Sequence, residues 1–160
     1  MLKKLANFLE KVQVKMGVIF LSIFFLVIVI QMFARYSGIS LIWTEEVANN
    51  AFIWSVFMGA SVMVHRKGHF RFSLLYENLS GKARAIMVLI INLILLVFSG
   101  AVFYYGIIAS QNFWNYNWFS LPQIKMGYMF VSIPIMGGTM FIYILDHIVD
   151  SIYELRGAEE

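Results

Sequence analysis

The sequence lacks cysteine altogether and has few charged side chains. Without cysteine it can form no disulfide, no thiolate nucleophile and no cysteine-ligated metal site. Charged residues make up only 13% of the 160 residues and hydrophobic residues 61%, whereas ordinary soluble domains are about 25% charged. So few charges cannot cover the surface of a soluble protein of this size. We therefore expect a protein that lies in a lipid bilayer.

Material for catalysis is also scarce. The chain has nine carboxylates and three histidines, so we expect no enzyme activity, no metal and no cofactor. Its net charge of +3 is more typical of membrane topology than of a nucleic-acid partner, because the basic residues flank apolar runs.

Four uncharged, apolar runs are long enough to cross a bilayer, whose core of about 30 Å needs about 20 residues in a helix. They cover about residues 16–34, 47–64, 85–110 and 126–145. From Gln111 the chain becomes aromatic and polar, which is typical of the headgroup layer. Pro134, Gly137 and Gly138 interrupt the fourth run, so we expect a kinked helix there. We predict an all-α membrane protein, with residues 1–160 as a single integral membrane domain of four transmembrane helices.

The segment before the first run has the pattern of an amphipathic helix. Its apolar residues recur at helical spacing, with charges elsewhere around the helix; they are Leu2, Leu5, Phe8, Leu9 and Val12. We therefore expect a separate N-terminal amphipathic helix in the membrane interface, with a frayed cytoplasmic tail as the alternative. The first run is too long for the apolar part of a cleavable signal peptide, so we expect it to be retained.

Lysine and arginine are distributed unevenly about the four runs. Ten of the 12 lie in the N-terminal segment, the middle loop and the tail, whereas Arg35 and Lys125 lie in the other two loops. By the positive-inside rule, both termini and the middle loop face the cytoplasm.

Most of the chemically distinctive residues lie between Arg35 and His69. Thr44 is a candidate N-cap of the second helix, and Glu45 and Glu46 would then lie in its first turn, where the helix dipole favours carboxylates. Alternatively, one of these glutamates forms an ion pair with Arg35 that fixes the outer hairpin or meets a partner subunit. The sequence leaves both interpretations open.

The second helix carries two further patterns. Ala51, Ser55 and Gly59 recur every four residues and would let another helix approach closely; we favour packing within the chain over packing against a partner. An adjoining stripe is too polar for lipid, so we expect protein to cover it. It consists of Asn50, Trp54, Phe57 and Ser61.

Two groups of aromatic and histidine residues have ordinary explanations as well as functional ones. His65 and His69 lie one helical turn apart and His147 ends the fourth helix. They could hold a metal or a haem iron, but basic neighbours such as Arg66 favour contacts with lipid phosphates. The loop after the third run is rich in aromatics, which favours an aromatic belt over a docking surface. These are Phe113, Trp114, Tyr116, Trp118 and Phe119.

The segment from Arg35 to His69 resembles the small membrane subunit of tripartite ATP-independent periplasmic (TRAP) transporters, the DctQ-like family. That family has an arginine that ends the first span, a W-x-E-E start to the second, a Gly-Ala step and an R-x-G-H exit. These features fall at Arg35, Trp43, Glu45, Glu46, Gly59, Ala60, Arg66, Gly68 and His69. Two departures are Asn49 and Asn50, where relatives often carry an arginine, and the run Phe70 to Ser73, where they often carry an acidic residue.

The resemblance implies a sodium-coupled transport complex of a bacterial inner membrane. In such a complex a periplasmic solute-binding protein captures an organic anion such as a carboxylate or sialic acid. A large multi-span subunit, a separate chain that holds the sodium and substrate sites, then moves the anion, and the small subunit scaffolds it. The small subunit's own residues are structural or contact a partner: Arg35, Trp43, Glu45, Glu46, Trp54, Gly59, Arg66 and His69. From the residues alone, a four-helix haem or quinone anchor of an oxidoreductase is the alternative, and a self-contained small exporter is a third.

Overall fold

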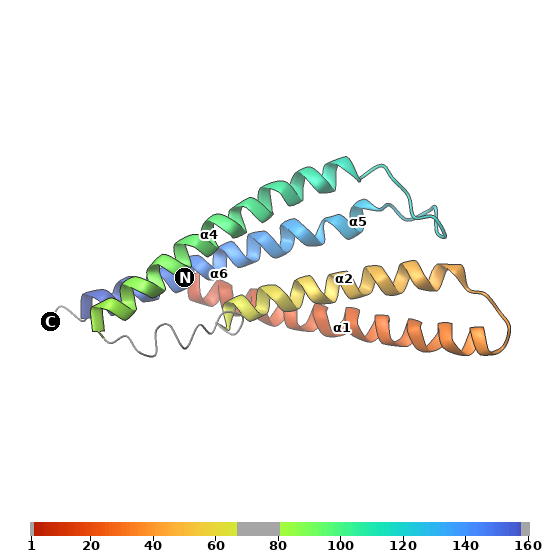
Figure 1. Ribbon diagram of the computed structural model, residues 1–160, viewed down its shortest axis with the longest axis horizontal. Helices are drawn as coiled ribbons and strands as arrows, with labels where there is room; N and C mark the ends of the chain where they lie inside the picture. The colour runs from red at the N-terminus through yellow and green to blue at the C-terminus, as the bar shows by residue number, and fades with distance from the viewer. Residues whose placement is uncertain (1, 67–80, 158–160) are drawn as a thin grey trace.

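The computed structural model describes residues 2–66 and 81–157, and within them the backbone forms five helices (Figure 1). They are α1 (Leu2–Tyr36), α2 (Ile42–His65), α4 (Gly81–Asn112), α5 (Gly127–Phe130) and α6 (Ser132–Gly157). The described residues form no β-strand, only one isolated bridge. Four segments are long and apolar enough to cross a membrane. Three are α1, α2 and α4, and the fourth is formed by α5 and α6 together. The prediction of an all-α membrane protein is therefore confirmed.

The first helix is one continuous element of 35 residues. The separate N-terminal helix expected from the sequence is not formed, because the N-terminal segment runs into the first span without a break. No proline or glycine precedes Gly17, so nothing in that stretch ends a helix. Ala6 and Gln13, which share one face of the helix, are buried, whereas Phe8 of the predicted interfacial stripe is exposed.

A short turn joins α1 to α2. Gly38 has a φ of 76°, in the left-handed region that favours glycine. α2 begins at Ile42, and its N-cap residue, Leu41, makes no side-chain cap. The prediction that Thr44 is the N-cap is therefore wrong. Thr44 lies inside the first turn, and its hydroxyl donates a hydrogen bond to the Leu41 carbonyl at 2.6 Å.

The fourth apolar run is divided into α5 and α6 at Val131. Pro134 explains this break, since it has no N–H to bond the carbonyl of Phe130 and its ring crowds that carbonyl. Gly137 and Gly138, which we expected to add to the kink, lie within α6 and do not interrupt it.

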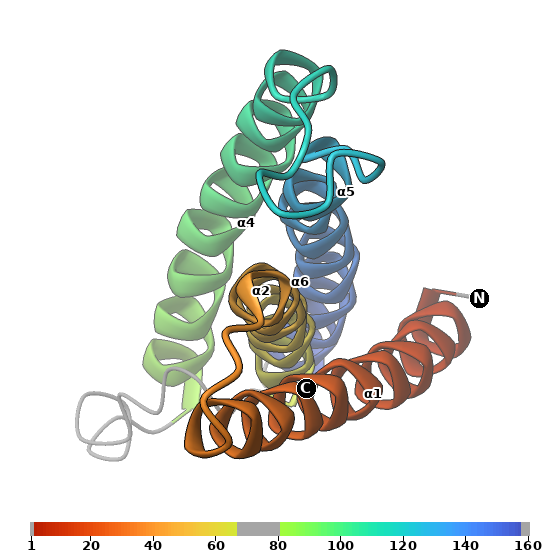
Figure 2. The ribbon, with the colours of Figure 1, turned by 90° about the vertical axis from the view of Figure 1, so that its right-hand side faces the viewer.

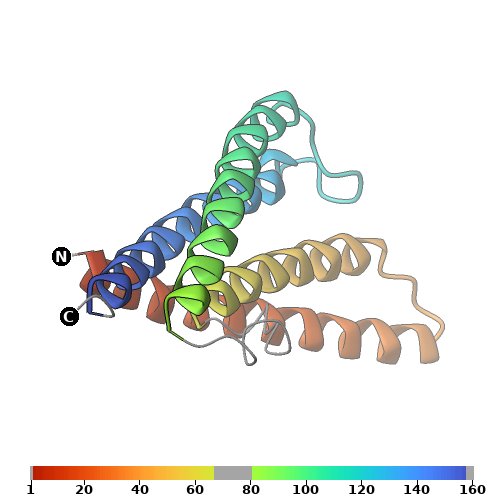
Figure 3. The same ribbon diagram turned by 60° about the vertical axis from the view of Figure 1, so that its left-hand side comes forward.

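The helices pair into two hairpins, α1 with α2 and α4 with α6. Both chain termini lie at one end, which we call the terminal end; the loops at residues 37–41 and 113–126 lie at the other, the loop end (Figure 1). The hairpins meet mainly through α2 and α6, which lie between the outer helices α1 and α4 (Figure 2). They diverge towards the loop end (Figure 3).

Glycine residues bring α4 and α6 unusually close together. A Cβ at position 137 in place of Gly137 would lie 2.6 Å from the backbone nitrogen of Phe103, and one in place of Gly106 would lie 2.8 Å from the nitrogen of Pro134. Real Cβ atoms essentially never come within 3.0 Å of another heavy atom in this way. Contacts between backbones therefore set the distance between these helices.

The buried core lies towards the terminal end, where α1, α2 and α6 meet. It is formed by Ala6, Val64, Met140, Tyr143 and Ile144. Beside it, the Gln13 side-chain nitrogen donates hydrogen bonds to the hydroxyls of Ser61 and Thr139, each at 2.8 Å. The hydroxyl of Tyr143 donates to the Gln13 side-chain oxygen at 2.5 Å. These four residues, which we call the Gln13 network, connect three helices, and each buried polar group is compensated within the chain.

Candidate functional site

The loop between α4 and α5, residues 113–126, folds back on itself at the loop end. The backbone N–H of Trp118 donates to the carbonyl of Ile124 at 3.0 Å, and that of Met126 donates to the carbonyl of Tyr116 at 2.7 Å. These bonds give the loop a defined shape although it contains neither helix nor strand.

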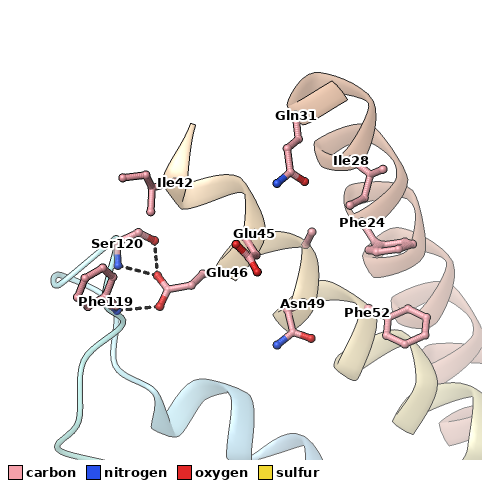
Figure 4. A pocket seen from close by; sticks show the side chains of 11 residues that line it. Phe24, Ile28, Gln31, Ile42, Glu45, Glu46, Asn49, Phe52, Phe119 and Ser120 are labelled. Carbon is pink, nitrogen blue, oxygen red and sulfur yellow. Dashed lines mark hydrogen bonds between the residues drawn. The ribbon is translucent and has the colours of Figure 1, made fainter. Parts of the chain in front are cut away.

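Glu46 of α2 holds this loop (Figure 4). Its carboxylate accepts hydrogen bonds from the backbone N–H groups of Phe119 and Ser120, each at 2.8 Å, and from the Ser120 hydroxyl. Hydrogen bonds to an ionised carboxylate are about twice as strong as neutral ones. We call these three residues the loop anchor. It links the two hairpins at the end where their helices diverge.

Trp54 makes a second link between the hairpins. Its indole N–H donates to the carbonyl of Tyr128, in α5, at 3.1 Å. Its ring stacks on that of Phe20, in α1, with 5.2 Å between ring centroids. Trp54 therefore contacts elements of both hairpins.

A cavity of about 570 Å³ lies beside the loop anchor, between α1, α2 and the loop (Figure 4). Its wall is partly apolar, and Gln31, Glu45 and Asn49 supply polar groups. The residues that line it are Phe24, Ile28, Gln31, Ile42, Glu45, Glu46, Ala48, Asn49, Phe52, Phe119 and Ser120. The wall therefore combines an apolar surface with side chains that can form hydrogen bonds.

Arg35 does not form the ion pair that the sequence allowed. In the described part of the chain, the charged atoms of Arg35 do not come within 4.0 Å of Glu45 or Glu46. The carboxylate of Glu46 instead accepts hydrogen bonds from the backbone N–H groups of the loop. Arg35 and Glu45 are both exposed and line a neighbouring cavity of about 340 Å³. Trp43, in the first turn of α2, is also exposed.

The small-residue face of α2 divides into a packed part and an open part. Ala51 is buried, and a Cβ in place of Gly17 of α1 would lie 3.8 Å from the carbonyl oxygen of Ser55. A Cβ in place of Gly59, however, would meet nothing within 4 Å. The preference for packing within the chain is therefore wrong at Gly59, which is exposed.

The aromatic residues of the loop also fall into two groups. Phe113 stacks on Phe130 with 4.3 Å between ring centroids, and Trp114 packs edge-on against Tyr128. Phe119, whose backbone N–H belongs to the loop anchor, has a side chain that is 87% exposed. The base of the loop therefore packs on α5, while Phe119 projects from the molecule.

A polar cluster joins α1, α2 and α6 at the terminal end. Arg66, just after α2, forms an ion pair with Glu10 at 2.6 Å. The Nε2 atom of His65 lies 3.1 Å from the side-chain oxygen of Asn7, and the Nε2 atom of His147 lies 3.0 Å from the carbonyl oxygen of His65. No group of three or more metal-ligating side chains occurs within the ranges that the structure describes.

A comparison with protein families decides between the candidate functions. The family model for the DctQ component of tripartite ATP-independent periplasmic transporters matches residues 24–153, which is most of the chain. The chain belongs to the DctQ family. A search of curated proteins finds no match.

Membership of the DctQ family confirms the resemblance and makes the chain a component of a transporter. The haem or quinone anchor is thereby set aside. Seven of the predicted structural or interface residues lie both in the matched region and in the described structure: Arg35, Trp43, Glu45, Glu46, Trp54, Gly59 and Arg66. His69 lies in the matched region but outside the described residues, so the predicted proximity of His65 and His69 cannot be compared with the structure.

Sequence reasoning singled out Glu46, Trp54 and Arg66 but missed other residues that connect the helices of this DctQ protein. Gln13 carried a usable signal, because it lies seven residues after Ala6 and so on the same helix face. Ser120 carried none, because it is 74 residues from Glu46 in the sequence and only the folded loop brings them together.

Proposed function

We propose that this chain is the small membrane subunit of a sodium-coupled TRAP transporter, and that it scaffolds the large transport subunit, a separate chain. The transported substrate is an organic anion, such as a carboxylate or sialic acid, delivered by a periplasmic solute-binding protein. The family match supports membership of such a complex. The surface of the outer helices supports the scaffolding role.

The observation that carries this proposal is the long apolar face of the outer helices. The most apolar stretches of α1 and α4 are much less buried than those of α2 and α6. On α1, Phe25 and Phe33 are 65% and 64% exposed, and on α4, Val97 is 75% exposed. Contiguous apolar surface of this kind contacts lipid or a partner. We assign part of it to the large subunit.

The internal contacts of the chain suit a scaffold. The Gln13 network and the polar cluster around Glu10 and Arg66 connect the helices at the terminal end, and the loop anchor connects the hairpins at the loop end. A subunit whose helices are fixed to one another presents a constant surface to its partner, which lowers the entropic cost of assembly.

We further propose a bacterial inner-membrane location with both termini in the cytoplasm. Within the described ranges, basic residues gather on the terminal side of the predicted spans; they include Lys3, Lys4, Lys11, Lys15, Arg66, Lys82 and Arg84. Arg35 and Lys125 lie at the loop end. The positive-inside rule then orients the terminal end towards the cytoplasm.

Site-specific photo-crosslinking tests the partner surface. A crosslinking residue in place of Phe25, Phe33 or Val97, introduced one at a time, should join this chain to the large subunit from at least one of the two outer helices. Because all three side chains are exposed, these changes leave the core intact. Crosslinks to lipid alone from all three positions would refute the assignment of this surface.

Uptake measurements test the scaffolding role. Membrane vesicles that contain this chain and the large subunit are mixed with the solute-binding protein and a panel of organic anions. They should take up substrate when a sodium gradient is imposed. Omission of this chain should lower the yield of the large subunit and maximal uptake together, with the half-saturating substrate concentration nearly unchanged. A normal yield with a strongly raised half-saturating substrate concentration would instead give this chain a role in substrate binding. Uptake at full rate without sodium would refute the coupling to the sodium gradient.

A further inference from the structure

Two cavities at the loop end adjoin each other. The cavity of Figure 4, of about 570 Å³, and the neighbouring cavity of about 340 Å³ share three lining residues, Gln31, Ile42 and Glu45. We call the two cavities together the α1–α2 groove, because residues of α1, of α2 and of the turn between them form most of the wall.

The groove carries two opposite charges that the chain leaves without a counterion. Within the described residues, the carboxylate of Glu45 and the guanidinium of Arg35 form no ion pair with each other or with any other side chain. Both residues are exposed, so a ligand in the groove can reach them. Glu46, the other charged residue of the wall, already accepts hydrogen bonds from the loop. The groove therefore offers one free group for a cation and one for an anion.

The polarity of the groove falls with depth in the membrane. Arg35 and Glu45 lie near the ends of α1 and α2 that meet at the loop end. At 1.5 Å per residue, Phe24 is about 16 Å along α1 from Arg35, and Phe52 is about 10 Å along α2 from Glu45. The rings of these two phenylalanines pack against each other with 5.1 Å between centroids, and Ile28 adds to the apolar wall. A groove that is charged near the membrane surface and apolar below it matches the polarity of a lipid.

The free groups specify the headgroup of that lipid. A phosphate pairs well with the guanidinium of Arg35. The Glu45 carboxylate needs a cation with N–H donors, and the side-chain oxygens of Gln31 and Asn49 can accept further N–H groups. A primary ammonium carries three N–H donors, whereas the trimethylammonium of a choline headgroup has none. A headgroup with a net negative charge is disfavoured, because it would leave Glu45 without a countercharge.

We propose that the α1–α2 groove binds a phospholipid of the phosphatidylethanolamine class from the leaflet at the loop end. Its ammonium lies at Glu45, its phosphate at Arg35, and an acyl chain runs along Ile28 and Phe52. A short ethyl link joins the ammonium to the phosphate in this headgroup, and Arg35 and Glu45 line the same cavity, so one molecule pairs with both charges. This site goes beyond the transport role and does not depend on it.

Native mass spectrometry of the full-length chain in detergent tests the site. The two probes are dioleoylphosphatidylethanolamine and dioleoylphosphatidylcholine, which have the same acyl chains and the same phosphate, added at equal concentration. Only the first can donate N–H hydrogen bonds to Glu45, so the chain should retain it about three- to fivefold more than the second. Equal retention of the two lipids would overturn the proposal, and this comparison needs no variant.

Charge-matched substitutions then locate the site. Glu45→Gln should remove the preference for the ethanolamine lipid, whereas Asp150→Asn, which removes a carboxylate at the terminal end, should retain it. Arg35→Gln should lower the retention of both lipids and leave their ratio unchanged, because both contain the phosphate. Lys125→Gln, in the loop and outside the groove, should change neither. A preference that survives Glu45→Gln, or one that Asp150→Asn also removes, would contradict the site.

A basic segment of a protein partner is the other occupant that the free carboxylate allows. The same measurement on the complex with the large subunit distinguishes it from a lipid. The preference for the ethanolamine lipid should persist in the complex and should again be removed by Glu45→Gln. Loss of the preference in the wild-type complex would show that the partner protein fills the groove, and would overturn the proposal.

Discussion

Replacing Gly137 by alanine should force α4 and α6 apart. The new Cβ would lie 2.6 Å from the backbone nitrogen of Phe103 and 2.9 Å from its Cα, whereas ordinary contacts begin at 3.4 Å. These are backbone atoms of another helix, which cannot rotate out of the way as a side chain can. The helices must therefore separate by several tenths of an ångström, and neighbouring contacts between them weaken.

Two opposing terms set the size of the effect. Overpacking costs about 1–3 kcal/mol, and alanine gains about 1 kcal/mol over glycine within a helix. Gly59→Ala is a matched control, because Gly59 is also within a spanning helix and its new Cβ would meet nothing within 4 Å. The helix-propensity gain is common to both variants, so the difference between their free energies of unfolding, about 1–3 kcal/mol, reports the contact with Phe103.

Thermal unfolding of the wild type and both variants in one detergent, followed by circular dichroism, measures this difference. Gly59→Ala should unfold at or above the temperature of the wild type, and Gly137→Ala about 2–12 °C below Gly59→Ala. Equal midpoints for the two variants would refute the close approach of α4 and α6.

Three further predictions concern the polar contacts. Glu46→Ala removes the loop anchor, so a spin label at the tip of the loop should gain mobility, whereas Glu45→Ala should leave it unchanged; equal mobility in both variants would contradict the anchor. Gln13→Leu leaves the hydroxyl of Tyr143 buried without its partner and should lower the free energy of unfolding by about 1–3 kcal/mol, and Tyr143→Phe added to it should recover part of the loss; an unchanged free energy would count against the network. Arg66→Ala removes an ion pair whose arginine side chain is 58% exposed, so chemical unfolding should show a loss of only about 0.2–1 kcal/mol that shrinks in high salt; a much larger loss would be inconsistent with an exposed pair.

Some features of this fold follow from local chemistry and could be predicted. The thickness of the bilayer requires spanning helices of a certain length, so the absence of charge was enough to find four of them. The break before Pro134 follows from the missing N–H of one residue. The N-terminal segment was harder, because its periodicity indicates a helix but not where that helix ends. The informative signal there was the absence of any helix-breaking residue before Gly17.

The contacts between hairpins could not be predicted, because they depend on how the loop folds. Arg35, Glu45 and Glu46 lie near the adjoining ends of consecutive helices, which allowed an ion pair between Arg35 and one of the glutamates but did not require it. In the folded chain, the backbone N–H groups of Phe119 and Ser120 reach the same carboxylate. They are held in place by the turn of the loop, whereas a long arginine side chain must lose conformational entropy to bind. The Glu46 carboxylate therefore binds the loop and not Arg35, and no sequence pattern indicates this contact.

The unbroken first helix has a mechanical consequence. At 1.5 Å per residue its 35 residues measure about 52 Å, while the hydrocarbon core is about 30 Å thick. One rigid rod therefore extends well beyond the membrane or crosses it at a steep tilt. This rod packs against α2 along much of its length, as at Gly17, Phe20 and Phe24. α1 and α2 therefore tilt together, so a displacement of this hairpin on one side of the membrane is delivered to the other side without passing through any joint.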